Sequence, residues 1–118
     1  DLHSFPTRRS SDLSFLHIEP DNWPDTNDYG FWSVTLYGED NFLYGNDMNR
    51  YNITDRDKWQ RNDDGSLDIY ISHEPDTEHP DNWLPAPADD FHLIFRIYNP
   101  VPRIAHNEWT MPIITRLD

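Results

Sequence analysis

The stretch that decides the fold is Phe91-His92-Leu93-Ile94-Phe95-Arg96-Ile97-Tyr98, in the last third of the chain. Its odd-numbered positions are all large and apolar, whereas most even-numbered positions are polar. A period of two is typical of a β-strand that buries one face, because successive side chains point to opposite sides. We therefore predict a strand over residues 91–98 that contributes four side chains to a core: Phe91, Leu93, Phe95 and Ile97.

The same period recurs at residues 31–37 and 67–72, which predicts two further strands. Their inward side chains are expected to be Trp32, Val34 and Leu36, then Leu67, Ile69 and Ile71. Weaker strand signals lie at residues 15–18 and 111–117. No window keeps the 3.6-residue spacing of an amphipathic helix, so helix is limited to a turn or two within residues 54–59 or 101–107.

The residues between these strands favour turns and loops. Asp64-Gly65 predicts a tight turn, since glycine accepts positive φ, and four prolines predict one long exposed loop over residues 72–90. The tetrapeptide Pro-Asp-Asn-Trp occurs at residues 20–23 and 80–83, but its flanks do not match, which favours coincidence over repetition. Short strands at this spacing predict an all-β fold, an antiparallel β-sandwich of jelly-roll type.

Composition excludes several classes of protein. The chain has 118 residues, 22 Asp and Glu against 9 Lys and Arg, a net charge of −13 and no cysteine. This length predicts one domain. The sequence contains no run of about 18 apolar residues, so no membrane span is predicted. The negative charge argues against a nucleic-acid partner, and without cysteine there is no disulfide, thiol nucleophile or zinc–thiolate site.

Residues 1–13 differ from the rest of the chain. They have no strand or helix period, and they resemble a translated sequencing-adapter read-through rather than a signal peptide. We expect this segment to be non-native and disordered, and residues 14–118 to form the domain. We also expect strands that precede residue 14 in the natural protein to be missing, which would leave a sheet edge without its partner.

Five ordered blocks and the closing Trp-Thr-Met-Pro resemble one known family, domain-of-unknown-function family 1214. The blocks are residues 31–37, 49–51, 64–71, 82–87 and 96–98, and the closing motif is residues 109–112. The resemblance implies a jelly-roll-like module in the C-terminal half of a bacterial protein, behind a module of domain-of-unknown-function family 1254. It also implies export to the periplasm or the extracellular space. It implies no established activity, cofactor or catalytic residue.

A polar and aromatic sheet face is the main candidate site. His92, Arg96 and Tyr98 alternate with the predicted core residues, and Tyr70 lies on a strand that we expect to be adjacent. Arg and Tyr on a rigid sheet bind sugars or acidic groups by stacking and bidentate hydrogen bonds. The alternative is a structural Arg–carboxylate pair that also contacts the upstream domain.

Arg50 and Trp83 are two further candidates for ligand binding. We interpret Arg50 in the same two ways as Arg96. Trp83 lies in a proline-rich segment, where an exposed indole would offer a stacking surface. The alternative for Trp83 is a plug at the end of the sandwich, with its N–H bonded to backbone.

The remaining clusters predict no chemistry. The acidic, histidine-containing residues 73–81 match no metal-ligand spacing, and residues 55–64 do not follow an EF-hand register. We therefore expect no metal site, no cofactor and no catalytic residue. Two hypotheses remain: a non-catalytic scaffold or partner-binding module of an exported two-domain protein, or a carbohydrate- or small-ligand-binding protein or enzyme. The second would use the polar-aromatic face or the interface with the upstream domain.

Overall fold

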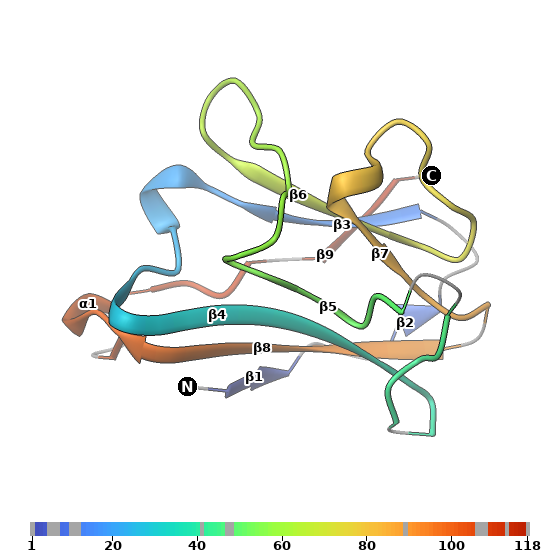
Figure 1. Ribbon diagram of the computed structural model, residues 1–118, viewed down its shortest axis with the longest axis horizontal. Helices are drawn as coiled ribbons and strands as arrows, with labels where there is room; N and C mark the ends of the chain where they lie inside the picture. The colour runs from blue at the N-terminus through green and yellow to red at the C-terminus, as the bar shows by residue number, and fades with distance from the viewer. Residues whose placement is uncertain are drawn as a thin grey trace.

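The computed structural model describes residues 2–4, 8–9, 13–40, 42–46, 49–88, 90–105, 109–112 and 114–117. They form two β-sheets that lie as two layers (Figure 1). Sheet A has the order β1-β8-β4-β5, and β2 also pairs with β8. Its strands are β1 (Leu2–Ser4), β2 (Arg8–Arg9), β4 (Thr26–Gly38), β5 (Asn52–Thr54) and β8 (Asp90–Pro100).

Sheet B has the order β7-β6-β3-β9. Its strands are β3 (Leu13–Ile18), β6 (Leu67–Ser72), β7 (Trp83–Pro85) and β9 (Ile114–Leu117). Helix is confined to two 3-10 turns, η1 (Pro20–Asn22) and η2 (Pro80–Asn82), and one α-helical turn, α1 (Pro102–Ala105). The all-β prediction is confirmed, and α1 lies within the predicted range 101–107. No helix in the described part of the chain has the length and apolarity to cross a membrane.

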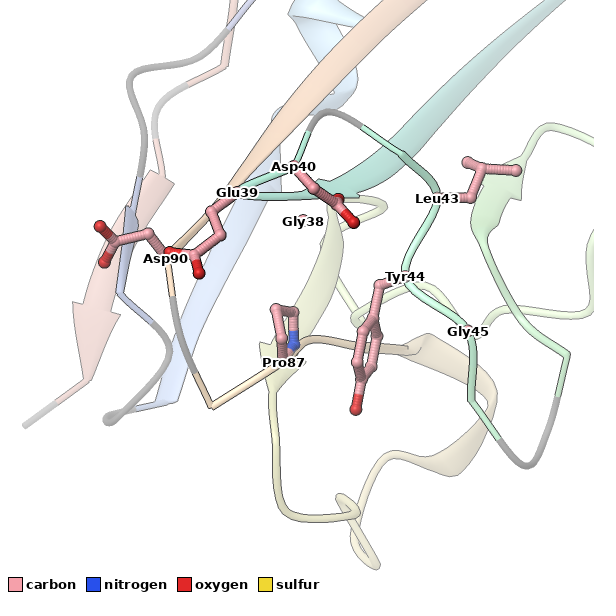
Figure 2. Close-up of a pocket in the computed structure, with 8 residues that line it drawn as sticks. All are labelled: Gly38, Glu39, Asp40, Leu43, Tyr44, Gly45, Pro87 and Asp90. Atoms are coloured by element: carbon pink, nitrogen blue, oxygen red, sulfur yellow. The ribbon is translucent and has the colours of Figure 1, made fainter.

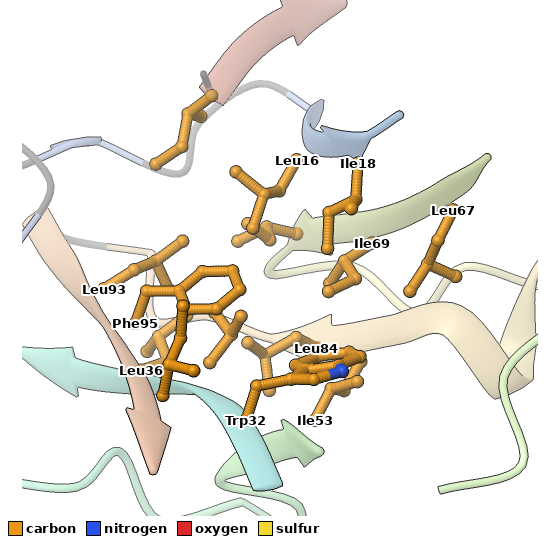
Figure 3. Close-up of a cluster of buried hydrophobic side chains, with 14 of the residues drawn as sticks. Leu16, Ile18, Trp32, Leu36, Ile53, Leu67, Ile69, Leu84, Leu93 and Phe95 are labelled. Atoms are coloured by element: carbon orange, nitrogen blue, oxygen red, sulfur yellow. The ribbon is translucent and has the colours of Figure 1, made fainter. Parts of the chain in front are cut away.

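The core lies between the sheets and contains the side chains that the alternation predicts (Figure 3). Phe91, Leu93, Phe95 and Ile97 of β8 are fully buried, and the inward residues of β4 and β6 are at most 2% exposed. Side chains from both sheets belong to one cluster, to which β3 adds Leu16 and Ile18. Burying one face of each sheet against the other accounts for the period of two in the sequence.

Two strands depart from the predicted arrangement. β6 and β7 pair in parallel, whereas the other ladders of the described residues are antiparallel. Residues 73–82, which end in the turn η2, carry the chain back across the sheet. β7 therefore runs in the same direction as β6. The prediction of an exposed loop over residues 72–90 is therefore wrong for the buried segment 82–86.

Two short stretches within residues 1–13 pair with sheet A. β1 pairs with β8 from Leu2↔Arg96 to Ser4↔Ile94, and β2 pairs at Arg8↔Phe91 and Arg9↔Asp90. A free strand edge offers backbone groups to any extended segment, whatever its sequence. This is why residues without a hydrophobic period pair there.

Candidate functional site

The outward side chains of β4 and β8 form a face of interlocked aromatic and polar groups, which we call the sheet A face. It comprises Phe31, Ser33, Thr35 and Tyr37 of β4 and His92, Arg96 and Tyr98 of β8. The strands pair Phe31 with Tyr98 and Tyr37 with His92. The rings of both pairs are stacked, with centroids 4.5 Å and 5.4 Å apart. Tyr98 is 52% exposed, whereas Ser33 and Thr35 are 5% and 6% exposed, so the face is open to solvent at Tyr98 and closed at the small residues of β4.

Arg96 occupies the middle of the sheet A face and bonds to neutral groups. Its Nη2 donates to the Tyr37 hydroxyl at 3.0 Å and its Nη1 to Thr35 Oγ1 at 3.4 Å. The guanidinium carbon also lies 6.0 Å from the Tyr37 ring centroid. No ion pair joins Arg96 to a carboxylate of the described residues, so the Arg–carboxylate alternative is not the arrangement found.

Tyr70 does not join the sheet A face. It lies in β6 of sheet B, where the inward positions are Leu67, Ile69 and Ile71, so its side chain is on the opposite side of the molecule. The expectation that Tyr70 neighbours Arg96 is therefore wrong. A period of two fixes which side chains point outward, but it does not say which sheet a strand joins.

Tyr70 stacks on His79, with ring centroids 4.0 Å apart and an angle of 15° between the planes. Its pKa is raised, first by burial and then by the charges of Asp68, Asp76 and Glu78. The hydroxyl therefore stays protonated at neutral pH and is available as a hydrogen-bond donor.

His17, in β3 beside β6, forms a second polar cluster on the sheet B side. Its Nδ1 lies 2.5 Å from Asp68 Oδ1, and its Nε2 lies 2.9 Å from Glu19 Oε1. The hydrogen bond with Asp68 is the main cause of a raised pKa for His17, with a smaller contribution from Glu19. This cluster ties η1 to sheet B, because Glu19 immediately precedes that turn.

Arg50 and Trp83 lie together at the turn η2. Arg50 Nη1 donates to the carbonyl oxygens of Pro80 and Trp83, each at 2.9 Å. Trp83 is 7% exposed, and its Nε1 donates to the backbone and the hydroxyl of Ser72. Trp83 is thus a buried indole with its N–H bonded to Ser72, and Arg50 binds backbone carbonyls of the segment that holds it.

The acidic segments are used for local turns. Asp76 Oδ1 accepts the backbone N–H of Glu78 at 3.0 Å and of His79 at 2.8 Å, and Asp64 Oδ1 accepts from the N–H and hydroxyl of Ser66. The hydrogen bonds from the Ser66 hydroxyl and backbone N–H lower the pKa of Asp64. In the described part of the chain, no three His, Asp or Glu side chains are grouped as metal ligands.

Several cavities open on the described surface, and one of them, of about 180 Å³, is lined by Phe31 of the sheet A face together with Thr54, Asp55 and Arg56 of another segment. The one in Figure 2 has a volume of about 310 Å³ and is lined by Tyr44 and Pro87, with Glu39, Asp40 and Asp90 around it. Another, of about 250 Å³, lies beside Tyr70 and His79. None of the cavities described for residues 13–117 is lined by His92, Arg96 or Tyr98.

The fold and these surfaces define an all-β, two-sheet domain with two stacked ring pairs on the outer side of sheet A. The family model "Protein of unknown function (DUF1214)" matches residues 9–102, and the chain belongs to this family. No curated protein matches the chain.

Solved structures resemble the chain over most of its length. The VPA0106 protein from Vibrio parahaemolyticus is 32% identical, with a TM-score of 0.77 over 92% of this chain and 26% of its own. An uncharacterized protein from Burkholderia cenocepacia shares the fold at 13% identity and a TM-score of 0.62, over 98% of this chain and 29% of its own. The chain thus spans about a quarter of the length of these proteins.

Proposed function

We propose that this domain is a non-catalytic, partner-binding module of a longer protein, and that the sheet A face docks on the remainder of that protein. The observation that carries the proposal is the two stacked ring pairs beside Arg96, of which Tyr98 is 52% exposed, on a face where no described cavity is lined by His92, Arg96 or Tyr98. Tyr and Arg are enriched in the centres of protein interfaces, and rigid side chains lose little entropy on docking.

The identity of the partner follows from the relatives of the chain. This domain covers 26% and 29% of two solved proteins, so most of each lies outside the matched part. We propose that the partner here is the upstream module of the same chain, of domain-of-unknown-function family 1254. On the same resemblance we propose a bacterial protein exported to the periplasm or the extracellular space.

The same proposal extends to the finer architecture. Two layers with mostly antiparallel pairing fit a jelly-roll-like sandwich. β8 has 11 residues, and between its two ends Arg96 is the one Asp, Glu, Lys or Arg. So few charged residues are typical of a central strand. We propose that a strand of the upstream chain pairs with β8 in the natural protein, where β1 and β2 pair in this chain.

The test compares this chain with one extended upstream along its natural reading frame. Hydroxyl-radical footprinting measures the exposure of individual aromatic side chains. We expect oxidation of Phe31 and Tyr98 to fall severalfold in the extended chain, while Tyr70 on the opposite side reacts as before. Arg96→Ser, which removes the hydrogen bond to Tyr37, should partly restore the oxidation of Tyr98.

Unchanged oxidation of Phe31 and Tyr98 in the extended chain would contradict docking through this face. Equal protection of Tyr70 would also contradict it, because a general loss of reactivity is not specific to the sheet A face. The competing hypothesis of a carbohydrate or small ligand on the sheet A face predicts that a sugar, rather than the extension, protects Tyr98.

A further inference from the structure

A second surface with a cavity lies on the other side of the molecule, beside β6. A cavity of about 250 Å³ opens between three segments that are distant in sequence: residues 60–62, Tyr70, and residues 78–82 at the turn η2. Asn82 fixes this arrangement, because its side-chain amide bonds to both backbone groups of Gln60, at 2.7 and 2.8 Å, and to the Asp68 carbonyl at 2.9 Å. The cavity walls are therefore joined by hydrogen bonds before any ligand arrives.

One wall of this cavity is aromatic. Tyr70 and His79 stack with only 15° between their planes. Asp76 accepts the backbone N–H of His79, and its carboxylate also lies 3.3 Å from His79 Nδ1. The second ring nitrogen, Nε2, has no partner among the described residues. The wall thus offers two polar groups, His79 Nε2 and the protonated Tyr70 hydroxyl.

The other lining groups carry both signs of charge. Arg61 lines the cavity with its guanidinium carbon 3.8 Å from the centroid of Trp23, an arrangement that leaves the N–H groups at the edge of the plane able to donate. Glu78 and Asp81 add carboxylates, and Gln60 adds an amide whose Nε2 donates to the Lys58 carbonyl. In the part of the chain that the structure describes, neither carboxylate forms an ion pair.

These groups select the class of ligand. Two carboxylates disfavour an anion such as phosphate, and Arg61 offsets part of their attraction for a simple cation. A neutral ligand with many hydroxyl groups uses groups of both signs, because each hydroxyl donates to a carboxylate or accepts from a guanidinium or imidazole. Small-molecule sites usually combine an aromatic or apolar surface with a small number of polar groups.

We propose that this cavity binds a neutral, hydroxyl-rich ligand with the dimensions of a single sugar ring. The site lies on the sheet B side, whereas docking of a partner is proposed for the sheet A face. A ligand and a partner can therefore bind at the same time, and each proposal is tested independently of the other.

The test uses the whole 118-residue chain and methyl β-glucoside as the probe. Nuclear magnetic resonance titration should shift the backbone amides of residues 60–62 and 78–82 in a saturable manner, with Kd on the order of 1–10 mM, as expected for a small open site. Sodium phosphate and ethylammonium chloride, titrated separately, should leave these amides without saturable shifts.

Matched variants separate the proposed site from the rest of the surface. His79→Ala should weaken binding by about tenfold, and Tyr70→Phe by about fivefold, as expected for the loss of one hydrogen bond. His92→Ala and Tyr98→Phe, which change the same residue types on the sheet A face, should bind as the unchanged chain does. Tyr70→Phe keeps the ring, so it remains informative even if His79→Ala disturbs the loop.

Three results would overturn the proposal. The first is the absence of saturable shifts with methyl β-glucoside, and the second is equal binding by the unchanged chain and Tyr70→Phe. The third is saturable binding of ethylammonium or phosphate in place of the sugar, which would assign the cavity to a charged ligand.

Discussion

The two Pro-Asp-Asn-Trp segments of this chain fold in the same way in different surroundings. Each begins with proline in a 3-10 turn, η1 or η2, and each ends with tryptophan in extended conformation. In both, the asparagine N–H donates to the carbonyl three residues earlier, at 3.1 Å. Proline at the first position of the turn fixes φ and has no N–H to leave unpaired, so the local sequence accounts for the shared shape.

The asparagine side chains also act alike. The amide of Asn22 bonds to both backbone groups of Thr110, and the amide of Asn82 bonds to both backbone groups of Gln60. Each asparagine amide therefore bonds to the N–H and the carbonyl of one remote residue, as the backbone of a neighbouring β-strand does. The interpretation of the two tetrapeptides as a coincidence holds for their flanks but misses this shared function of the turn.

The difference between the two turns is burial. Asn82 is 6% exposed and Trp83 is 7% exposed, whereas Asn22 and Trp23 are half-buried. Trp83 lies beside β6 with its N–H bonded to Ser72, while Trp23 packs at the edge of the core against Trp32, Trp59 and Arg61. The comparison teaches that a tetrapeptide sets the conformation of a turn, while its surroundings set how much the turn stabilises the fold.

The largest effect is expected from removing the two indoles. Trp83→Ala should lower the free energy of unfolding by about 3–5 kcal/mol, as for other large buried aromatic residues. Trp23→Ala should cost about 1–3 kcal/mol, because its ring is partly in water already. Urea unfolding followed by far-ultraviolet circular dichroism measures both, and equal losses would break the comparison.

The asparagines come next. Asn82→Ala removes three hydrogen bonds in a buried place and should cost about 2–3 kcal/mol. Asn22→Ala should cost about 1 kcal/mol or less, because water reaches the groups left behind at Thr110. Asn82→Asp is the matched control: it keeps the acceptor for the Gln60 N–H and loses both donated bonds. A loss for Asn22→Ala as large as that for Asn82→Ala would contradict burial as the cause.

The two arginines should differ less. Arg50→Met removes a charged donor from the carbonyls of Pro80 and Trp83 and should cost about 1–2 kcal/mol. Arg61→Met removes a cation over the Trp23 ring, an interaction of about 0.5–1 kcal/mol at an exposed position. Methionine keeps most of the packing of each stem, so the urea midpoints report the lost polar contact. A larger effect at Arg61 would mean that the cation–π contact, rather than the carbonyl bonds, is the stronger support.

The sequence predicts the parts of this fold that depend on local periodicity. Residues 67–72 form β6 with the predicted bounds, and β4 and β8 contain the other two predicted strands with the expected faces inward. Trp83–Pro85 could not be recognised as a strand, because it has three residues, ends in proline and, among the described strands, pairs with β6 alone and in parallel. Proline is tolerated at such a sheet edge, but nothing local predicts the partner.

The candidate sites show the same limit. Alternation places His92, Arg96 and Tyr98 on one outward face, but their cross-strand partners Phe31 and Tyr37 become known only from the pairing of β4 with β8. It could not separate Tyr70 from them, because assignment to a sheet depends on long-range pairing. Alternation does not reveal the cavity beside Tyr70, since Arg61 and His79 line it from distant segments that the contact between Asn82 and Gln60 joins.

The smallest expected effect is a pH dependence confined to the first turn. Glu19, which precedes η1, is held by His17, and the pKa of His17 is raised above its usual value of 6.5, chiefly by its hydrogen bond with Asp68. A raised pKa in the folded state means that the protonated form stabilises the fold. This stabilisation is complete below pH 6.5 and is lost as the pH rises through the pKa of the folded state.

The measurement is urea unfolding of the unchanged chain and of His17→Gln across this range of pH. The difference in free energy of unfolding between the two should shrink as the pH rises above 6.5, because only the unchanged chain loses a stabilising charge at residue 17. His92→Gln, on the sheet A face and away from both turns, serves as the control and should keep the pH dependence of the unchanged chain. If His17→Gln also keeps it, the pair of His17 with Asp68 does not stabilise this turn through its charge.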